Sequence, residues 1–304
     1  MSTAAPDLDQ PARLPAFQPV GGARKTKNAI ATTLVWLAFA VAVIPLVWVL
    51  WTVIERGLGP LLDAGWWTHS LSGLRPYETG GGAYHAIFGT IVQGLVTAVL
   101  SVPIGILVGI YLVEYGARSR LAKVTTFMVD ILTGVPSIVA ALFVYALWIT
   151  TFGLSRSAFA VTLALLLLMV PVVVRTTEEM LKIVPDELRE ASYALGIPKW
   201  KTIVKIVVPT ALSGIVTGVM LGLARVMGET APALVLVAYA PFINFDVFDG
   251  NMGNLPLMMA DQFNNPEAAG FDRTWGAAMT LVLIIMVFNL IAAVVSRFSS
   301  VKTK

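Results

Sequence analysis

The stretch LSGIVTGVMLGLARVMGETAPALVLVAYA, residues 212–240, is apolar along most of its length but carries an arginine and a glutamate near its centre. As a helix, a run of this length is sufficient to cross the roughly 30 Å hydrocarbon core of a bilayer. A charged side chain at that depth costs about 3 kcal/mol or more. Arg225 and Glu229 therefore require pairing, water or a function to offset this cost.

The composition of the whole chain identifies an integral membrane protein. Of its 304 residues, 57% are hydrophobic and 13% are charged, whereas soluble domains carry roughly 25% charged residues. The net charge of +3 and the lack of a basic patch interleaved with aromatic residues argue against nucleic-acid binding. There is no cysteine, and His69 and His85 are isolated, so we expect no metal site.

Six apolar segments are long enough to span a membrane, which predicts an all-α fold with six transmembrane helices. They are residues 29–54, 87–112, 124–149, 158–174, 212–240 and 275–295. The first is too long for the apolar core of a signal peptide and should remain as an anchor. We expect one membrane domain, 29–298, between a disordered tail at 1–28 and a short tail at 299–304.

The distribution of lysine and arginine predicts the orientation. If both termini are cytoplasmic, the inner segments contain 16 of the 21 basic residues and the outer segments contain 4, with Arg225 in the membrane. This is the asymmetry of the positive-inside rule. The outer loops 55–84 and 241–273 contain aromatic residues that either lie in the interfacial belt or form a docking surface for an external partner.

The inner loop RTTEEMLKIVPDELREASYALGIPKWKTIVKIVVP, residues 175–209, predicts short helices on the cytoplasmic face. Thr176 and Glu179 form a possible capping box, and Pro185 fits the first turn of the next helix. Gly196 suits the position that ends that helix, and a second short helix should follow Pro198. Its apolar face would consist of Trp200, Ile203, Val204 and Val207. An ordinary amphipathic helix on the membrane surface is the alternative.

Part of this loop resembles the EAA signature of ABC importer permeases. The matching positions are Glu190, Ala191, Ser192, Gly196, Ile206 and Pro209, with Ser192 in place of alanine and Val208 in place of leucine. The resemblance implies a type I importer fold in which this loop is a coupling helix held by a cytosolic ATPase subunit. The chain has no G-x-x-x-x-G-K-[ST] motif of its own. Partner subunits would therefore bind ATP-Mg, and this chain would bind no cofactor.

The span at 212–240 has a row of small residues beside its charges. Gly214, Gly218 and Gly222 recur every four residues, a spacing that lets membrane helices approach closely. Positions 218, 222, 225 and 229 share one helical stripe, so Arg225 and Glu229 should face protein or water.

Two functional interpretations of the charged pair remain open. Arg225 and Glu229 can form a static buried ion pair that fixes helix packing. Alternatively, with Thr230, they line an anion pathway, since a guanidinium matches the paired acceptors of an oxyanion. Pro232 should break the helix just beyond them and act as a hinge.

The segment ARVMGETAP, residues 224–232, resembles phosphate importer permeases of the PstA type, as does LTGVPSIVAAL, residues 132–142. The resemblance implies a second permease of the PstC type, two ATP-binding subunits of the PstB type and an external phosphate-binding protein of the PstS type. It also implies the bacterial plasma membrane.

Three alternatives remain. They are a permease for sulfate, molybdate or a phosphonate, an ion-coupled secondary carrier, and a membrane enzyme. The carrier would commonly show inverted repeats, and the enzyme would need a nucleophile–base pair or a metal cluster; neither feature is visible. Glu114 and Asp130, near the inner ends of the second and third spans, are expected to contact interfacial water.

Overall fold

The computed structural model describes residues 22–116 and 119–299, and these are helical or irregular, with no strand among them. The chain divides into two compact units, residues 1–51 and 52–304. Of the first unit, the structure describes residues 22–51, which belong to the long apolar helix α1 (Gly22–Leu61). Residues 22–28, predicted as disordered tail, are thus helical. The remaining tail predictions, 1–21 and 300–304, lie outside the described residues.

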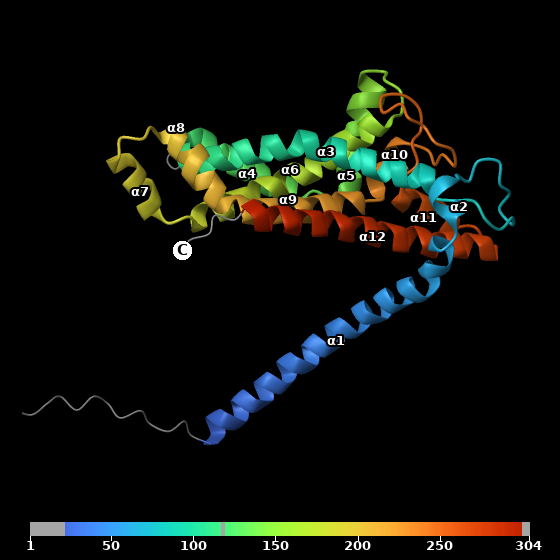
Figure 1. Ribbon diagram of the computed structural model, residues 1–304, viewed down its shortest axis with the longest axis horizontal. Helices are drawn as coiled ribbons and strands as arrows, with labels where there is room; N and C mark the ends of the chain where they lie inside the picture. The colour runs from blue at the N-terminus through green and yellow to red at the C-terminus, as the bar shows by residue number, and fades with distance from the viewer. Residues whose placement is uncertain (1–21, 117–118, 300–304) are drawn as a thin grey trace, which may run out of the picture. The chain divides into compact units, whose positions relative to one another are not determined.

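The second unit is built around four helices that run alongside one another (Figure 1). These are α3 (Tyr84–Ile110), α6 (Ala158–Ile183), α9 (Val208–Met227) and α12 (Ala268–Ser299). α6 packs against both α3 and α9, and α9 packs against α12. The contact of α3 with α6 depends on small residues, since a Cβ atom added to Gly105 would lie 2.6 Å from Val173 Cβ.

Five helices in the described part of the chain are long and apolar enough to cross a membrane, or six if one bent pair forms a single span. The bent pair is α4 (Arg120–Gly134) with α5 (Ser137–Val144) and its π-helical continuation η2 (Tyr145–Thr151), and the bend is 106°. The segment 124–149, predicted as one span, is therefore bent and not one continuous helix. Pro136 disfavours helical backbone at the residue before it, and Val135 is extended, with ψ 125°.

Three spans also differ from the prediction at their ends nearest residues 186–202. The second span continues from α3 through η1 (Tyr111–Tyr115), which is π-helical. α6 continues to Ile183, so no capping box forms at Thr176, whose hydroxyl instead donates to the Val172 carbonyl at 2.9 Å.

The fifth span begins well before residue 212. α8 (Lys199–Thr202), η3 (Ile203–Val207) and α9 together form one span, Lys199–Met227, so the second short helix expected after Pro198 is the start of this span. The apolar face predicted for this short helix is only partly buried. Ile203 and Val207 are buried, whereas Trp200 and Val204 are exposed.

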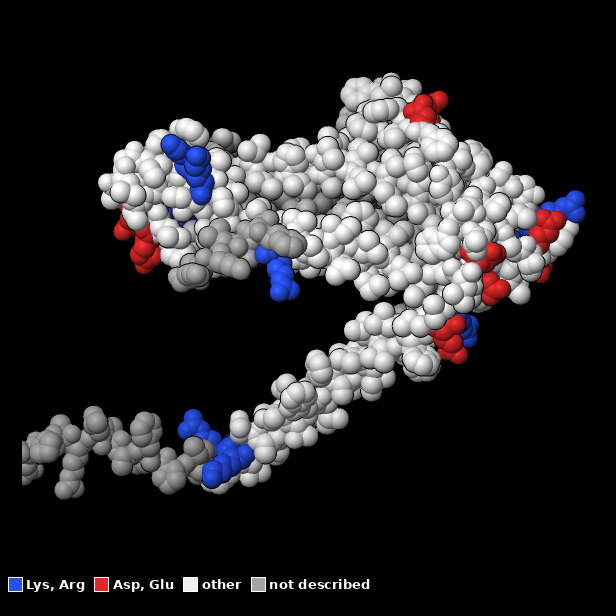
Figure 2. Space-filling model, viewed as in Figure 1, with Lys and Arg blue, Asp and Glu red and all other residues white. Residues whose placement is uncertain are grey.

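The remaining short helices lie at the two ends of the second unit. α7 (Asp186–Ala194) is at one end with α8, and α2 (Ala64–Thr68), α10 (Ala231–Leu236) and α11 (Leu255–Phe263) are at the other (Figure 1). On the face drawn in Figure 2, charged side chains of this unit gather toward these two ends and the surface between them is uncharged. This is the pattern expected of a bundle surrounded by lipid along its middle.

Candidate functional site

Arg225 lies in the last turn of α9, and its Nε is 3.8 Å from Glu229 Oε1. The helix ends at Met227, so Glu229 follows the helix end and does not continue its stripe. The side chain of Arg225 is 57% exposed in this subunit and that of Glu229 is 20% exposed. The pair is therefore not a buried ion pair within the single chain, and the guanidinium is accessible.

The helix breaks at residues 228–230, so the break lies before Pro232 and includes Glu229. Pro232 lies in the first turn of α10, where a missing N–H loses no hydrogen bond. Thr230 precedes this helix, and its carbonyl accepts a hydrogen bond from Leu234 N at 3.0 Å. α10 packs against α5 and α6. Two separate helices therefore hold the residues on either side of Glu229.

The three glycines of α9 lie against α6. A Cβ atom at Gly218 would be 2.5 Å from Thr176 Cβ, and one at Gly214 would overlap the Met180 side chain. Gly222 has more room, since its nearest neighbour would be Val172 Cγ1 at 3.4 Å. The glycine row is thus a helix contact, and the Arg225 side chain extends out of it to the surface.

α7 ends in two hydrogen bonds of a Schellman motif. Gly196 N donates to Tyr193 O at 2.9 Å, and Ile197 N donates to Ser192 O at 3.1 Å. Gly196 has φ +73°, and a Cβ atom there would meet nothing within 4 Å. Within this chain the glycine is needed for its backbone conformation and not for close approach.

The other residues of the EAA segment divide between exposed and buried positions. Glu190 and Ala191 are exposed. Ser192 is buried, and its Oγ lies 2.7 Å from Thr202 Oγ1, which ties α7 to the start of the fifth span. Ile206 and Pro209 are half-buried in that span.

Sequence reasoning missed an ion pair that attaches α7 to the bundle. Glu114 in η1 accepts a hydrogen bond from Arg189 Nε at 3.0 Å, and its side chain is only 5% exposed. The expectation that Glu114 contacts interfacial water is therefore wrong. Asp130 differs, because its side chain is largely exposed and pairs with Arg175. The sequence contained one signal for the pair of Glu114 with Arg189: an acidic residue at the end of an apolar span and an arginine in a later inner loop.

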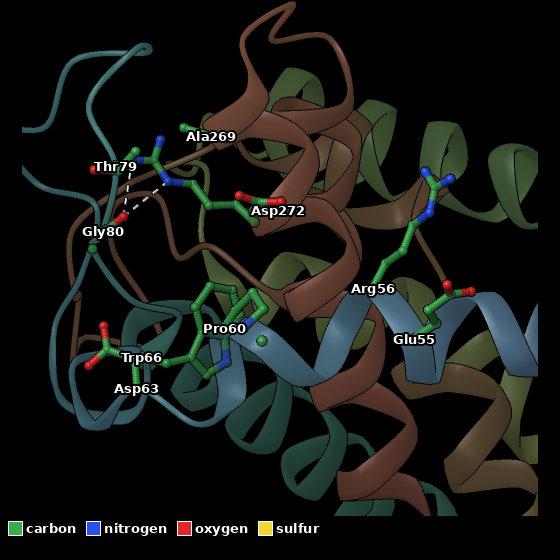
Figure 3. A pocket seen from close by; sticks show the side chains of 12 residues that line it. Glu55, Arg56, Pro60, Asp63, Trp66, Thr79, Gly80, Ala269 and Asp272 are labelled. Atoms are coloured by element: carbon green, nitrogen blue, oxygen red, sulfur yellow. Dashed lines mark hydrogen bonds between the residues drawn. The ribbon is translucent and has the colours of Figure 1, made fainter.

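At the end that holds α2, opposite α7 (Figure 1), the second unit has a cavity of about 360 Å³ (Figure 3). Arg273 of α12 is buried beside it and donates to the carbonyls of Glu78 and Gly80, at 2.5 and 3.2 Å. These bonds fix the loop after α2 onto α12. The charged residues that line the cavity are Glu55, Arg56, Asp63, Asp272 and Arg273.

The two histidines differ in burial, since His69 is exposed and His85 is buried. His85 is buried, and its Nε2 lies 3.1 Å from the hydroxyl of Tyr239. Burial raises the pKa of the Tyr239 phenol above its ordinary value, so the hydroxyl keeps its proton. No group of three potential metal ligands occurs among the described residues.

Comparison with known proteins agrees with this architecture. Residues 101–303 match the family described as "Binding-protein-dependent transport system inner membrane component". The chain is 58% identical over 303 residues to the phosphate transport system permease protein PstA 1 of Mycobacterium tuberculosis, covering 100% of this chain and 99% of that one. It is 56% identical to PstA of Mycobacterium leprae, covering 94% of each chain.

A solved structure shows the same fold at low sequence identity. It is the bacterial ABC transporter involved in import of the acidic polysaccharide alginate, with a TM-score of 0.59 and 13% identity. The likeness covers 91% of this chain and 100% of that chain.

Proposed function

Because the chain belongs to the family of binding-protein-dependent transport system inner membrane components, we propose that it is the PstA-type permease subunit of an ATP-driven importer of inorganic phosphate. It forms half of the anion pathway, and a second permease of the PstC type forms the other half. The observation that carries this proposal is identity above 50% over the full chain to permeases of phosphate transport systems.

The position of Arg225 supports an anion as the transported species. Among the described residues, Glu229 is its one ion-pair partner, and that contact is a single 3.8 Å approach to Nε. The Nη groups of the guanidinium therefore remain available for the paired oxygen acceptors of phosphate. Glu229 holds the arginine and competes with the anion, which keeps binding reversible, and Thr230 supplies a hydroxyl beside them.

The cytoplasmic end fits an ATPase partner. Exposed apolar side chains surround the C-terminal end of α7. Leu195, directly after α7, is 79% exposed, and Trp200 in α8 is 61% exposed. Exposed large apolar groups beside a short helix are suited to a protein groove. We place here two PstB-type subunits, which bind ATP-Mg and supply the hydrolysis. The outer end receives a phosphate-binding protein of the PstS type, and the complex lies in the bacterial plasma membrane.

Another oxyanion is the second candidate, because the same guanidinium fork accepts sulfate, molybdate or a phosphonate. An ion-coupled secondary carrier is disfavoured by the family to which the chain belongs.

Co-purification tests the proposal. The chain is tagged at its C-terminus, extracted in mild detergent with its native partners, and the associated proteins are identified by mass spectrometry. We expect a second permease, an ATP-binding subunit and a binding protein that takes up phosphate in preference to sulfate. If the co-purified binding protein prefers sulfate or molybdate, that oxyanion replaces phosphate as the proposed substrate. If the chain is recovered without any ATPase, the proposed coupling to ATP hydrolysis is contradicted.

A further inference from the structure

We propose that Glu114 and Arg189 are positioning residues that transmit movement of the coupling helix α7 to the second and fourth spans. The inference rests on the proposed function, since it concerns how ATP hydrolysis by a partner is coupled to this subunit. Neither residue belongs to the EAA segment or to the region of Arg225.

Arg189 joins α7 to two different spans. Its Nε and Nη2 both lie 3.0 Å from Glu114 Oε1, at the cytoplasmic end of the second span. Its Nη1 donates to the Val184 carbonyl at 2.7 Å and its Nη2 to the Leu181 carbonyl at 2.9 Å. Those carbonyls are at the end of α6, where backbone acceptors lack helical partners. One side chain therefore fixes α7 to the ends of both spans.

The start of the fifth span reaches the same residue from another side. Lys199 Nζ donates to the backbone carbonyl of Glu114 and lies 4.8 Å from the centroid of the Tyr115 ring. The carboxylate and carbonyl of Glu114 thus receive cations from α7 and from the first turn of the fifth span. Glu114 is the point at which the second span, α7 and the start of the fifth span meet.

Burial makes this junction stiff. The side chains of Glu114 and Arg189 are 5% and 13% exposed, so a partner that moved away would leave a poorly solvated charge. The nearby pair of Lys182 with Glu178 differs, because both residues belong to α6 and Lys182 is 60% exposed. That pair joins no two elements and cannot transmit movement between them.

The consequence is that α7 cannot shift against the second and fourth spans while the pair is intact. If an ATPase subunit moves α7, the ends of these spans move with it. Loss of the pair should therefore leave ATP hydrolysis by the partner in place but reduce the phosphate moved for each ATP hydrolysed.

The test uses the complete complex in proteoliposomes, supplied with phosphate-loaded binding protein. The variants are Glu114→Gln, Arg189→Gln and their double, with Lys182→Gln as the matched control. Basal ATP hydrolysis should stay close to that of the wild type. Phosphate transported per ATP should fall at least about threefold in Glu114→Gln, and further in Arg189→Gln, which also loses the bonds to the Val184 and Leu181 carbonyls. The double should match Arg189→Gln, because Glu114→Gln then removes no further contact with Arg189. Lys182→Gln should retain the wild-type ratio.

Glu114→Asp tests whether the pair acts in coupling transport to ATP hydrolysis or only in folding. It keeps the negative charge but shortens the reach to Arg189. It should assemble normally and show an intermediate ratio. An unchanged ratio in assembled Glu114→Gln and Arg189→Gln complexes would overturn the inference. So would a failure of every variant, including Glu114→Asp, to assemble, because the pair would then be needed for folding. Failure of the proposed function is distinguishable, because the wild-type complex itself would then transport no phosphate.

Discussion

At the scale of single residues, the surroundings of Arg225 separate the two roles considered for it, helix packing and anion binding. A packing role would require the pair with Glu229 to be enclosed by the subunit. The Arg225 side chain is instead more than half exposed, at the end of a helix whose glycine row makes the contact with α6. An accessible guanidinium beside a helix break is suited to meeting an anion that passes between two permease subunits.

Replacing Arg225 should therefore affect uptake more than assembly. Arg225→Ala should lower phosphate uptake at least about tenfold, the loss expected for a charge-assisted pair of hydrogen bonds, and Arg225→Lys should rescue poorly because it lacks the planar fork. Radiolabelled phosphate uptake and complex abundance are measured in parallel. Arg156→Ala, which removes an outer arginine stacked on Tyr145, is the control. A well-assembled Arg225→Ala/Glu229→Ala double variant with near-normal uptake would exclude the pathway role.

Gly196 gives a second prediction at this scale. Its positive φ should make Gly196→Val unfavourable by about 1–2 kcal/mol, whereas Gly196→Asn should cost less because asparagine tolerates this conformation. Because there is free space around Gly196, neither substitution should cause a steric clash within the subunit. Thermal denaturation of the purified subunit compares the two variants. Equal destabilisation by both would show that the backbone conformation is not the reason for glycine.

At the scale of elements, α6 organises the subunit because α3 and α9 pack against it through small residues. The close contact of Gly218 with Thr176 predicts that Gly218→Ala overpacks the interface by about 1–3 kcal/mol. Gly222→Ala should be nearly neutral, since its Cβ would have a 3.4 Å neighbour. Gly59→Ala, where a Cβ meets nothing, is the control. The midpoint of thermal denaturation should fall for Gly218→Ala alone; a similar fall for Gly222→Ala would contradict this packing.

Hydropathy was sufficient to predict the helices of the bundle, because length and apolarity are local properties. The sequence also contained a signal for the bend, because Val135 precedes a proline. The signal was overlooked because the surrounding run is apolar throughout. Other features depend on contacts distant in sequence. Arg175, directly after the predicted end of the fourth span, pairs with Asp130, 45 residues earlier, and Glu114 meets an arginine 75 residues later. A pattern within one segment cannot reveal such partners.

At the scale of the whole molecule, the orientation of the chain in the membrane determines which partners can reach α7 and the cavity beside Arg273. If both termini are cytoplasmic, α7 faces the ATPase and the cavity beside Arg273 faces the external binding protein. Reporter fusions after Tyr77, Arg156 and Asp246 should report outside, and fusions after Ala194 and Arg297 should report inside. An outside signal from the fusion after Ala194 would contradict the coupling role, because a cytosolic ATPase could not reach α7.

Phosphate uptake by the reconstituted complex tests the central claim most directly. Proteoliposomes containing this chain, the second permease and the ATP-binding subunits receive radiolabelled phosphate with the external binding protein, with ATP supplied on the opposite side. We predict uptake that requires ATP and this chain, and that excess unlabelled phosphate suppresses while equal sulfate does not. Uptake that persists when this chain is omitted, or that sulfate suppresses as well as phosphate, would contradict its assignment as a phosphate permease.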